Sequence, residues 1–189
     1  MEAFLVSMGV VALAEIGDKT QLLALVLAAK FRKPVPIIAG IFVATIVNHA
    51  LAGAMGAWFA AAVGPTAMRW ILGLSFIAMA IWTLIPDRLE DDNDAIPRFG
   101  VFGTTLIAFF LLEMGDKTQI ATVALAVKYS SLLGVVAGTT FGMMLVNVPA
   151  VLLGEAAARR LPMRLVHGMA ATIFLVLGIS VLLGAGSLH

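Results

Sequence analysis

One seven-residue sequence occurs twice in this chain, and both copies carry ionisable side chains within apolar surroundings. The first copy is Glu15-Ile16-Gly17-Asp18-Lys19-Thr20-Gln21, and the second is Glu113-Met114-Gly115-Asp116-Lys117-Thr118-Gln119. Six positions are identical, and the remaining one exchanges isoleucine for methionine. A charged group in membrane hydrocarbon costs about 2.5–3.5 kcal/mol on insertion scales. Six such groups in two matched sets therefore indicate a function.

The spacing of these residues predicts two compact polar patches. In a continuous helix, residues three and four apart lie on one face, so the glutamate, aspartate and lysine of each copy should project together. Gly17 and Gly115 permit either the close approach of a neighbouring helix or a local break that frees backbone carbonyls as ligands, and they are candidate hinges. The patches are Glu15, Asp18 and Lys19 in the first copy and Glu113, Asp116 and Lys117 in the second.

The charges of the two patches favour exchange of a divalent cation for protons. Four carboxylates and two lysines sum to −4 + 2 = −2. One divalent cation neutralises this charge, and so do two protons, so metal and protons would compete for the same oxygens. We expect Lys19 and Lys117 to organise the site as counter-charges, either holding it together without metal or being displaced by it. The four carboxylates are the expected metal ligands.

The available ligand atoms narrow the choice of ion. Oxygen ligands suit Ca²⁺, Mn²⁺ and Mg²⁺, and the absence of cysteine argues against Cu(I) and Zn²⁺. His49 could add a nitrogen ligand, which Mn²⁺ tolerates better than Ca²⁺ does. The alternative is that His49 only packs or makes a local hydrogen bond, because the equivalent position in the second half is Val148. Six further side chains are candidate site-lining groups, with ordinary interhelical hydrogen bonding as the alternative for the two asparagines: Thr20, Gln21, Asn48, Thr118, Gln119 and Asn147. We expect no cofactor.

The composition predicts an all-α integral membrane protein. Of the 189 residues, 61% are hydrophobic and 12% are charged, and the mean hydropathy is +1.06. Soluble domains have about 45–50% apolar and 25% charged residues. A helical span takes about 20 apolar residues, and six segments qualify: Ala3–Ala29, Pro34–Val63, Thr66–Ile85, Phe99–Val127, Leu132–Ala156 and Met163–Leu183. The lipid bilayer is an expected partner and nucleic acid is not.

The two halves of the chain match beyond the repeated sequence. Asn48 in the second span corresponds to Asn147 in the fifth. An odd number of spans in each half places the halves in opposite orientations, which predicts an inverted repeat with its pseudo-two-fold axis in the membrane plane. The predicted units are repeat 1 (residues 1–86), an acidic linker (87–98) and repeat 2 (99–189). Because one chain holds both repeats, no oligomer is required.

The distribution of lysine and arginine predicts the orientation. Eight of these residues fall in the first, third and fifth loops and two in the others: Lys30, Arg32, Lys33, Arg88, Arg98, Arg159, Arg160 and Arg164 against Arg69 and Lys128. Positive loops face the cytoplasm. Both termini should therefore lie outside, and the acidic linker should be cytoplasmic, either as a solvated connection or as a collector of cations.

A duplicated E-x-G-D-(K/R)-(T/S) motif in a six-span chain of this length resembles the small cation/proton antiporter family of bacterial manganese exporters. That family also includes chloroplast and Golgi transporters of manganese and calcium. The resemblance covers the whole chain and implies export of Mn²⁺, or else Ca²⁺, from the cytoplasm against inward protons across a bacterial inner membrane. It also implies that Glu15, Asp18, Glu113 and Asp116 are the ion ligands.

Three other functions fit parts of the sequence. Intramembrane aspartyl proteases also use two buried Gly-Asp pairs, but a shared-proton Asp dyad has no use for the adjacent Glu and Lys. An exporter of an organic cation fits a net charge of −2 less well than a divalent ion does. A passive channel is disfavoured because a compact site in an inverted repeat is typical of alternating access.

Overall fold

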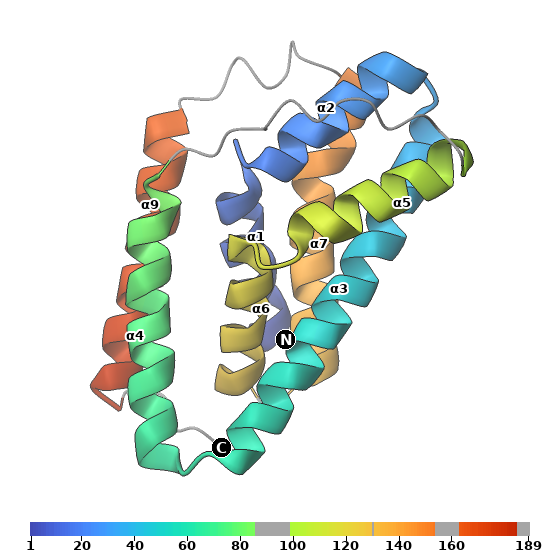
Figure 1. Cartoon of the computed structure of the whole chain (residues 1–189). Coiled ribbons are helices and arrows are strands. Elements are labelled where there is room, and N and C mark those ends of the chain that lie inside the picture. Colours follow the sequence, from blue (N-terminus) through green and yellow to red (C-terminus); the bar gives the residue numbers. More distant parts are fainter. Residues whose placement is uncertain (86–98, 130, 154–162, 185–189) are drawn as a thin grey trace.

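The computed structural model describes residues 1–85, 99–129, 131–153 and 163–184, and every regular element in these ranges is a helix (Figure 1). The acidic linker, Arg88, Arg98, Arg159 and Arg160 lie outside the described residues. The helices are α1 (Glu2–Glu15), α2 (Lys19–Phe31), α3 (Pro34–Ala62), α4 (Pro65–Thr83), α5 (Gly100–Glu113), α6 (Lys117–Lys128), α7 (Leu132–Leu153) and α9 (Met163–Leu182).

Four of the six expected spans are single helices long and apolar enough to cross a membrane. They correspond to α3, α4, α7 and α9. The other two expected spans are each divided into two shorter helices, α1 with α2 and α5 with α6. Both divisions fall inside the repeated sequence, so the structure shows the local break that is one of the two alternatives for Gly17 and Gly115.

Backbone geometry at the glycines explains both breaks. Gly17 has φ of 81° and Gly115 has φ of 80°, a left-handed conformation that costs other residues about 1–2 kcal/mol. The residue before each glycine is extended, and the aspartate after it is the N-cap of the next helix. Aspartate is among the preferred N-cap residues. Each motif therefore ends one helix and starts another within three residues.

Helices from opposite halves of the chain pack against each other. The main partners are α1 with α7, α3 with α5 and α6, and α4 with α9. Glycines permit the closest crossings: a Cβ on Gly142 would lie 2.5 Å from the Met8 carbonyl oxygen, and one on Gly56 would lie 2.7 Å from that of Val123. The α1–α7 and α3–α6 contacts thereby bring each motif to a helix of the other half.

The polar residues of the motifs lie between two apolar clusters. One cluster is built from α1, α4, α6, α9 and the start of α7, and the other from α2, α3, α5 and the end of α7. In Figure 1, α2 lies above α1 and α5 lies above α6. The two breaks therefore lie between an upper pair of helices and a lower pair.

Candidate functional site

The four motif carboxylates are all buried at this level of the fold. Glu15 and Asp116 are 0% exposed, Glu113 is 1% exposed and Asp18 is 2% exposed. Each glutamate is the last residue of a helix, α1 or α5, and each aspartate caps the start of the next. The helix breaks therefore present both carboxylates of a motif from consecutive helix ends.

Each motif makes the same two internal hydrogen bonds. The Thr20 hydroxyl donates to Oε1 of Glu15, and the Thr118 hydroxyl donates to Oε1 of Glu113. The backbone N–H of the glycine within the break also has a partner in its own motif: Gly17 donates to Gln21 Oε1 at 2.8 Å. In the second copy, Gly115 donates to Gln119 Oε1 at 2.6 Å. Threonine and glutamine thus stabilise the broken backbone and orient the glutamate.

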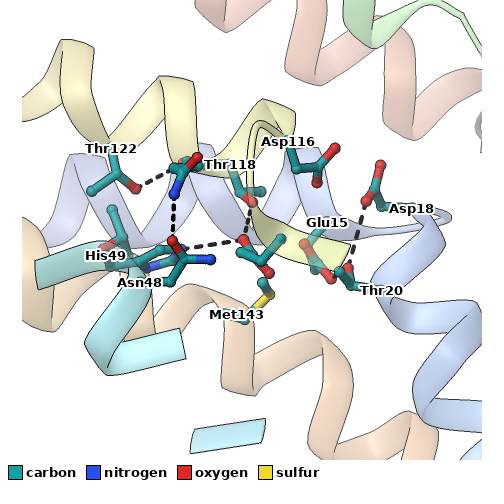
Figure 2. Close-up of polar contacts among 12 residues, drawn as sticks. Glu15, Asp18, Thr20, Asn48, His49, Asp116, Thr118, Thr122 and Met143 are labelled. Carbon is teal, nitrogen blue, oxygen red and sulfur yellow. Dashed lines mark hydrogen bonds and ion pairs between the residues drawn. The ribbon is translucent and has the colours of Figure 1, made fainter. Parts of the chain in front are cut away.

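The two motifs exchange ion pairs with each other. Lys19 Nζ lies 3.1 Å from Asp116 Oδ1, and Lys117 Nζ lies 3.6 Å from Asp18 Oδ1. Lys117 also donates to the Ile85 carbonyl at 3.3 Å. The expected patch, in which each lysine serves its own motif, is thus incomplete, because both of these ion pairs join opposite halves of the chain. These ion pairs join the two motifs into one polar cluster. Figure 2 shows Glu15 and Asp18 of the first motif near Asp116 of the second.

A helix of the other half packs against each motif, α7 at the first and α3 at the second, and these two helices contribute different side chains. Asn147 of α7 donates to Glu15 Oε1 at 3.0 Å and to the Met143 carbonyl at 3.1 Å. On α3 it is His49 that reaches the glutamate, with Nε2 at 3.4 Å from Glu113 Oε1. Asn48 instead accepts a hydrogen bond from Gln119. The two asparagines thus occupy matched sequence positions but contact different groups.

Several buried oxygens in this cluster are available to a cation. Among the residues that the structure describes, Glu15 Oε2, Glu113 Oε2, Asp116 Oδ2 and Asn147 Oδ1 accept no hydrogen bond. However, no three or more acidic or histidine side chains in the described ranges gather closely enough to hold a metal as they stand. The arrangement around the lysines would therefore have to change before these carboxylates could surround one ion.

One contact of the site was not anticipated from the sequence. His167 of α9 lies with Nε2 3.2 Å from the carbonyl oxygen of Ile16, the residue at the first break. A helix end leaves its last carbonyls without intrahelical partners, so a histidine on a neighbouring span is a suitable partner. The signal available in the sequence was a polar residue within an apolar span, but its position opposite Ile16 depends on helix packing.

The chain is similar to known proteins over most of its length. A family model described as "Divalent cation/proton antiporter GDT1" matches residues 3–91 and 101–188. The chain belongs to the GDT1 family. Members of this family are cation/proton antiporters, so the protein is a membrane transporter and not an enzyme. The aspartyl protease alternative is therefore wrong.

Individual members of the GDT1 family are similar over nearly the whole chain. A Vibrio cholerae protein named "Putative manganese exporter" is 49% identical over 95% of this chain and 90% of its own length. GDT1-like protein sll0615 of Synechocystis is 29% identical, covering 92% of this chain and 93% of its own. GDT1-like protein 5 of Arabidopsis thaliana is 28% identical, covering 97% and 96%. No solved structure matches the chain significantly.

Proposed function

We propose that this protein exports Mn²⁺ from the cytoplasm in exchange for protons, at one site formed by both motifs. Glu15, Asp18, Glu113 and Asp116 bind the ion when deprotonated and release it outside as protons replace it. Gln21, Gln119, Thr20, Thr118 and the two asparagines line the site. The ion is the transported substrate, and the protein needs no other cofactor.

The observation that carries this proposal is the reciprocal pairing of Lys19 with Asp116 and of Lys117 with Asp18. Two lysines opposite four buried carboxylates leave a net charge of −2. In the proposal, metal displaces the ammonium groups from the aspartates, and the carboxylates close on the ion. This step explains how carboxylates that do not yet surround a common point come to coordinate one ion. Ca²⁺ remains the closest competitor, because it also takes carboxylate and carbonyl oxygens.

We further propose that the chain forms six spans arranged as two inverted repeats in a bacterial inner membrane. Support comes from the two segments matched by the family model, residues 3–91 and 101–188. It also comes from the ion pairs that join the two motifs, and from the placement of α1 and α6 below α2 and α5 (Figure 1). Discontinuous helices at the repeat interface are the usual construction of transporter sites.

The proposed transport cycle uses the two breaks as hinges. Gly17 and Gly115 have left-handed backbones, so rotations there reorient α1 against α2 and α5 against α6. Rocking of one repeat against the other then opens the site to each side in turn, with the termini outside and the acidic linker in the cytoplasm. Each chain contains a complete site, so a monomer suffices.

Proton movement driven by metal in liposomes tests the exchange. Purified protein is reconstituted with a pH-sensitive dye in the lumen, and Mn²⁺, Ca²⁺ and Mg²⁺ are added in turn to the outside. We expect Mn²⁺ uptake with release of protons from the lumen, and no such release by Glu113→Gln. Metal uptake without proton movement at a clamped membrane potential would identify a channel or uniporter. No uptake of any of the three metals by folded protein would reject the proposed substrate class.

A further inference from the structure

His49 is the one nitrogen-bearing ring in direct contact with a motif carboxylate among the described residues. It lies on α3, fully buried, in the layer between the two apolar clusters, with Nε2 facing Glu113. Figure 2 shows the ring beside Asn48, near the second motif copy. Burial of an imidazole costs free energy unless its polar atoms form hydrogen bonds. Its Nδ1 accepts or donates no hydrogen bond within the part of the chain described.

The separation between His49 and Glu113 suits two ligands of one metal ion. The Nε2–Oε1 distance of 3.4 Å exceeds the usual range of about 2.7–3.2 Å for an N–H···O hydrogen bond. Two ligand atoms that each lie about 2.1 Å from one first-row ion are roughly 3.0–3.4 Å apart at coordination angles between about 90° and 110°. Glu113 Oε2 also has no hydrogen-bond partner among the described residues, so the carboxylate retains capacity for a cation.

The tautomer of His49 is compatible with metal binding. No hydrogen bond from Nδ1 to a described residue holds the proton on one nitrogen. With the proton on Nε2, the ring can donate to Glu113; with the proton on Nδ1, the Nε2 lone pair and the Glu113 oxygen face each other, and both can bind one cation. Metal binding therefore requires only that the proton lies on Nδ1.

We propose that His49 is a metal ligand that makes the site prefer a first-row transition ion such as Mn²⁺ over Ca²⁺ and Mg²⁺. This inference rests on the proposed exchange function and adds to it the residue that sets specificity. Ca²⁺ takes oxygen ligands, whereas imidazole nitrogen binds first-row ions with an affinity that rises from Mn²⁺ to Co²⁺. The site is then chemically unequal, with an amide at Glu15 and an imidazole at Glu113.

Substitution of His49 tests this specificity in the liposome assay. In His49→Gln an amide oxygen replaces the nitrogen, and in His49→Val the side chain matches Val148, which holds the equivalent position in the second half. We expect the KM for Mn²⁺ to rise about tenfold, that for Co²⁺ to rise more, and that for Ca²⁺ to change less than about threefold. An equal change for all three ions, or no change, would overturn the proposal.

Nitrogen coupling in the pulsed EPR spectrum of bound Mn²⁺ tests the ligand directly in the wild-type protein. Labelling with ¹⁵N-histidine should alter the coupling, and His49→Val should remove it. His167→Gln is the matched control and should retain it, because His167 contacts the Ile16 carbonyl and not a carboxylate. Absence of histidine nitrogen coupling in wild-type protein that binds Mn²⁺ would overturn the role of His49. Absence of exchange with every metal would instead reject the underlying function.

Discussion

The two copies of the motif make the same hydrogen bonds within themselves but differ in the side chains that a neighbouring helix places against them. In both, a threonine hydroxyl donates to the glutamate and a glutamine side chain accepts the glycine N–H. The neighbouring helix then supplies an asparagine to Glu15 but a histidine to Glu113. Shared internal contacts account for the helix breaks, and unequal external contacts can give the two halves different roles in one site.

Loss of either glutamate should have the largest effect. If both motifs form one site, Glu15→Gln and Glu113→Gln should each reduce Mn²⁺-driven proton exchange by about 100-fold or more, since changes even outside the ligand shell cost about 10–100-fold. The initial rate in liposomes measures this, with the exposed Glu2→Gln as control. Substantial exchange by one of the two variants alone would show that the copies are not equivalent in transport.

Double-mutant cycles should detect the ion pairs between the copies. We expect a coupling free energy of about 1–3 kcal/mol between Lys19→Met and Asp116→Asn, and of similar size between Lys117→Met and Asp18→Asn. Lys19→Met with Glu15→Gln is the contrasting pair, because Glu15 is hydrogen-bonded by Thr20 and Asn147. Denaturant unfolding in detergent micelles supplies the free energies. Stronger coupling within a copy than between copies would contradict the reciprocal pairing.

The two asparagines should differ although their sequence positions match. Asn147 donates directly to Glu15, whereas Asn48 accepts from Gln119. Asn147→Ala should therefore raise the KM for Mn²⁺ about tenfold, and Asn48→Ala should raise it less than about threefold. Metal-dependent initial rates decide this. A larger effect of Asn48→Ala would mean that the external contacts of the two copies are the reverse of those described.

The backbone at the breaks should give the smallest effect. Gly115→Ala meets open space, so its cost comes from the left-handed φ of 80° alone, and we expect a loss of about 1–2 kcal/mol in unfolding free energy. Gly9→Ala is the control, since Gly9 lies inside α1 with nothing within 4 Å of an added Cβ. That change should be neutral or stabilising by up to about 1 kcal/mol. Equal effects of the two changes would show that the break carries no strain for alanine.

Much of the helical layout could be predicted from the sequence. The boundaries of α3, α4, α7 and α9 follow from prolines, glycines and charges that interrupt long apolar runs. A local break at each motif was one of two alternatives, and the sequence did not decide between them because the apolar pattern continues on both sides of each motif. Local signals were nevertheless present, since a glycine followed by aspartate is a typical helix end and helix start.

The candidate residues of the site could also be predicted, but their pairing could not. Burial of the four carboxylates follows from apolar flanks of each motif. The pairing of Lys19 with Asp116, and the contact of His49 with Glu113, depend on how the helices of the two halves pack against each other. Nothing in the spacing of a single motif specifies these contacts between segments that are distant in the chain.

The number of Mn²⁺ ions bound per chain tests most directly whether the two copies form one site. Isothermal titration of purified protein in detergent, with Mn²⁺ as the titrant, measures it. We expect one ion per wild-type chain and loss of that binding in both Glu15→Gln and Glu113→Gln. Two ions per chain, or one ion of unchanged affinity in either variant, would contradict it, because each copy would then bind metal independently.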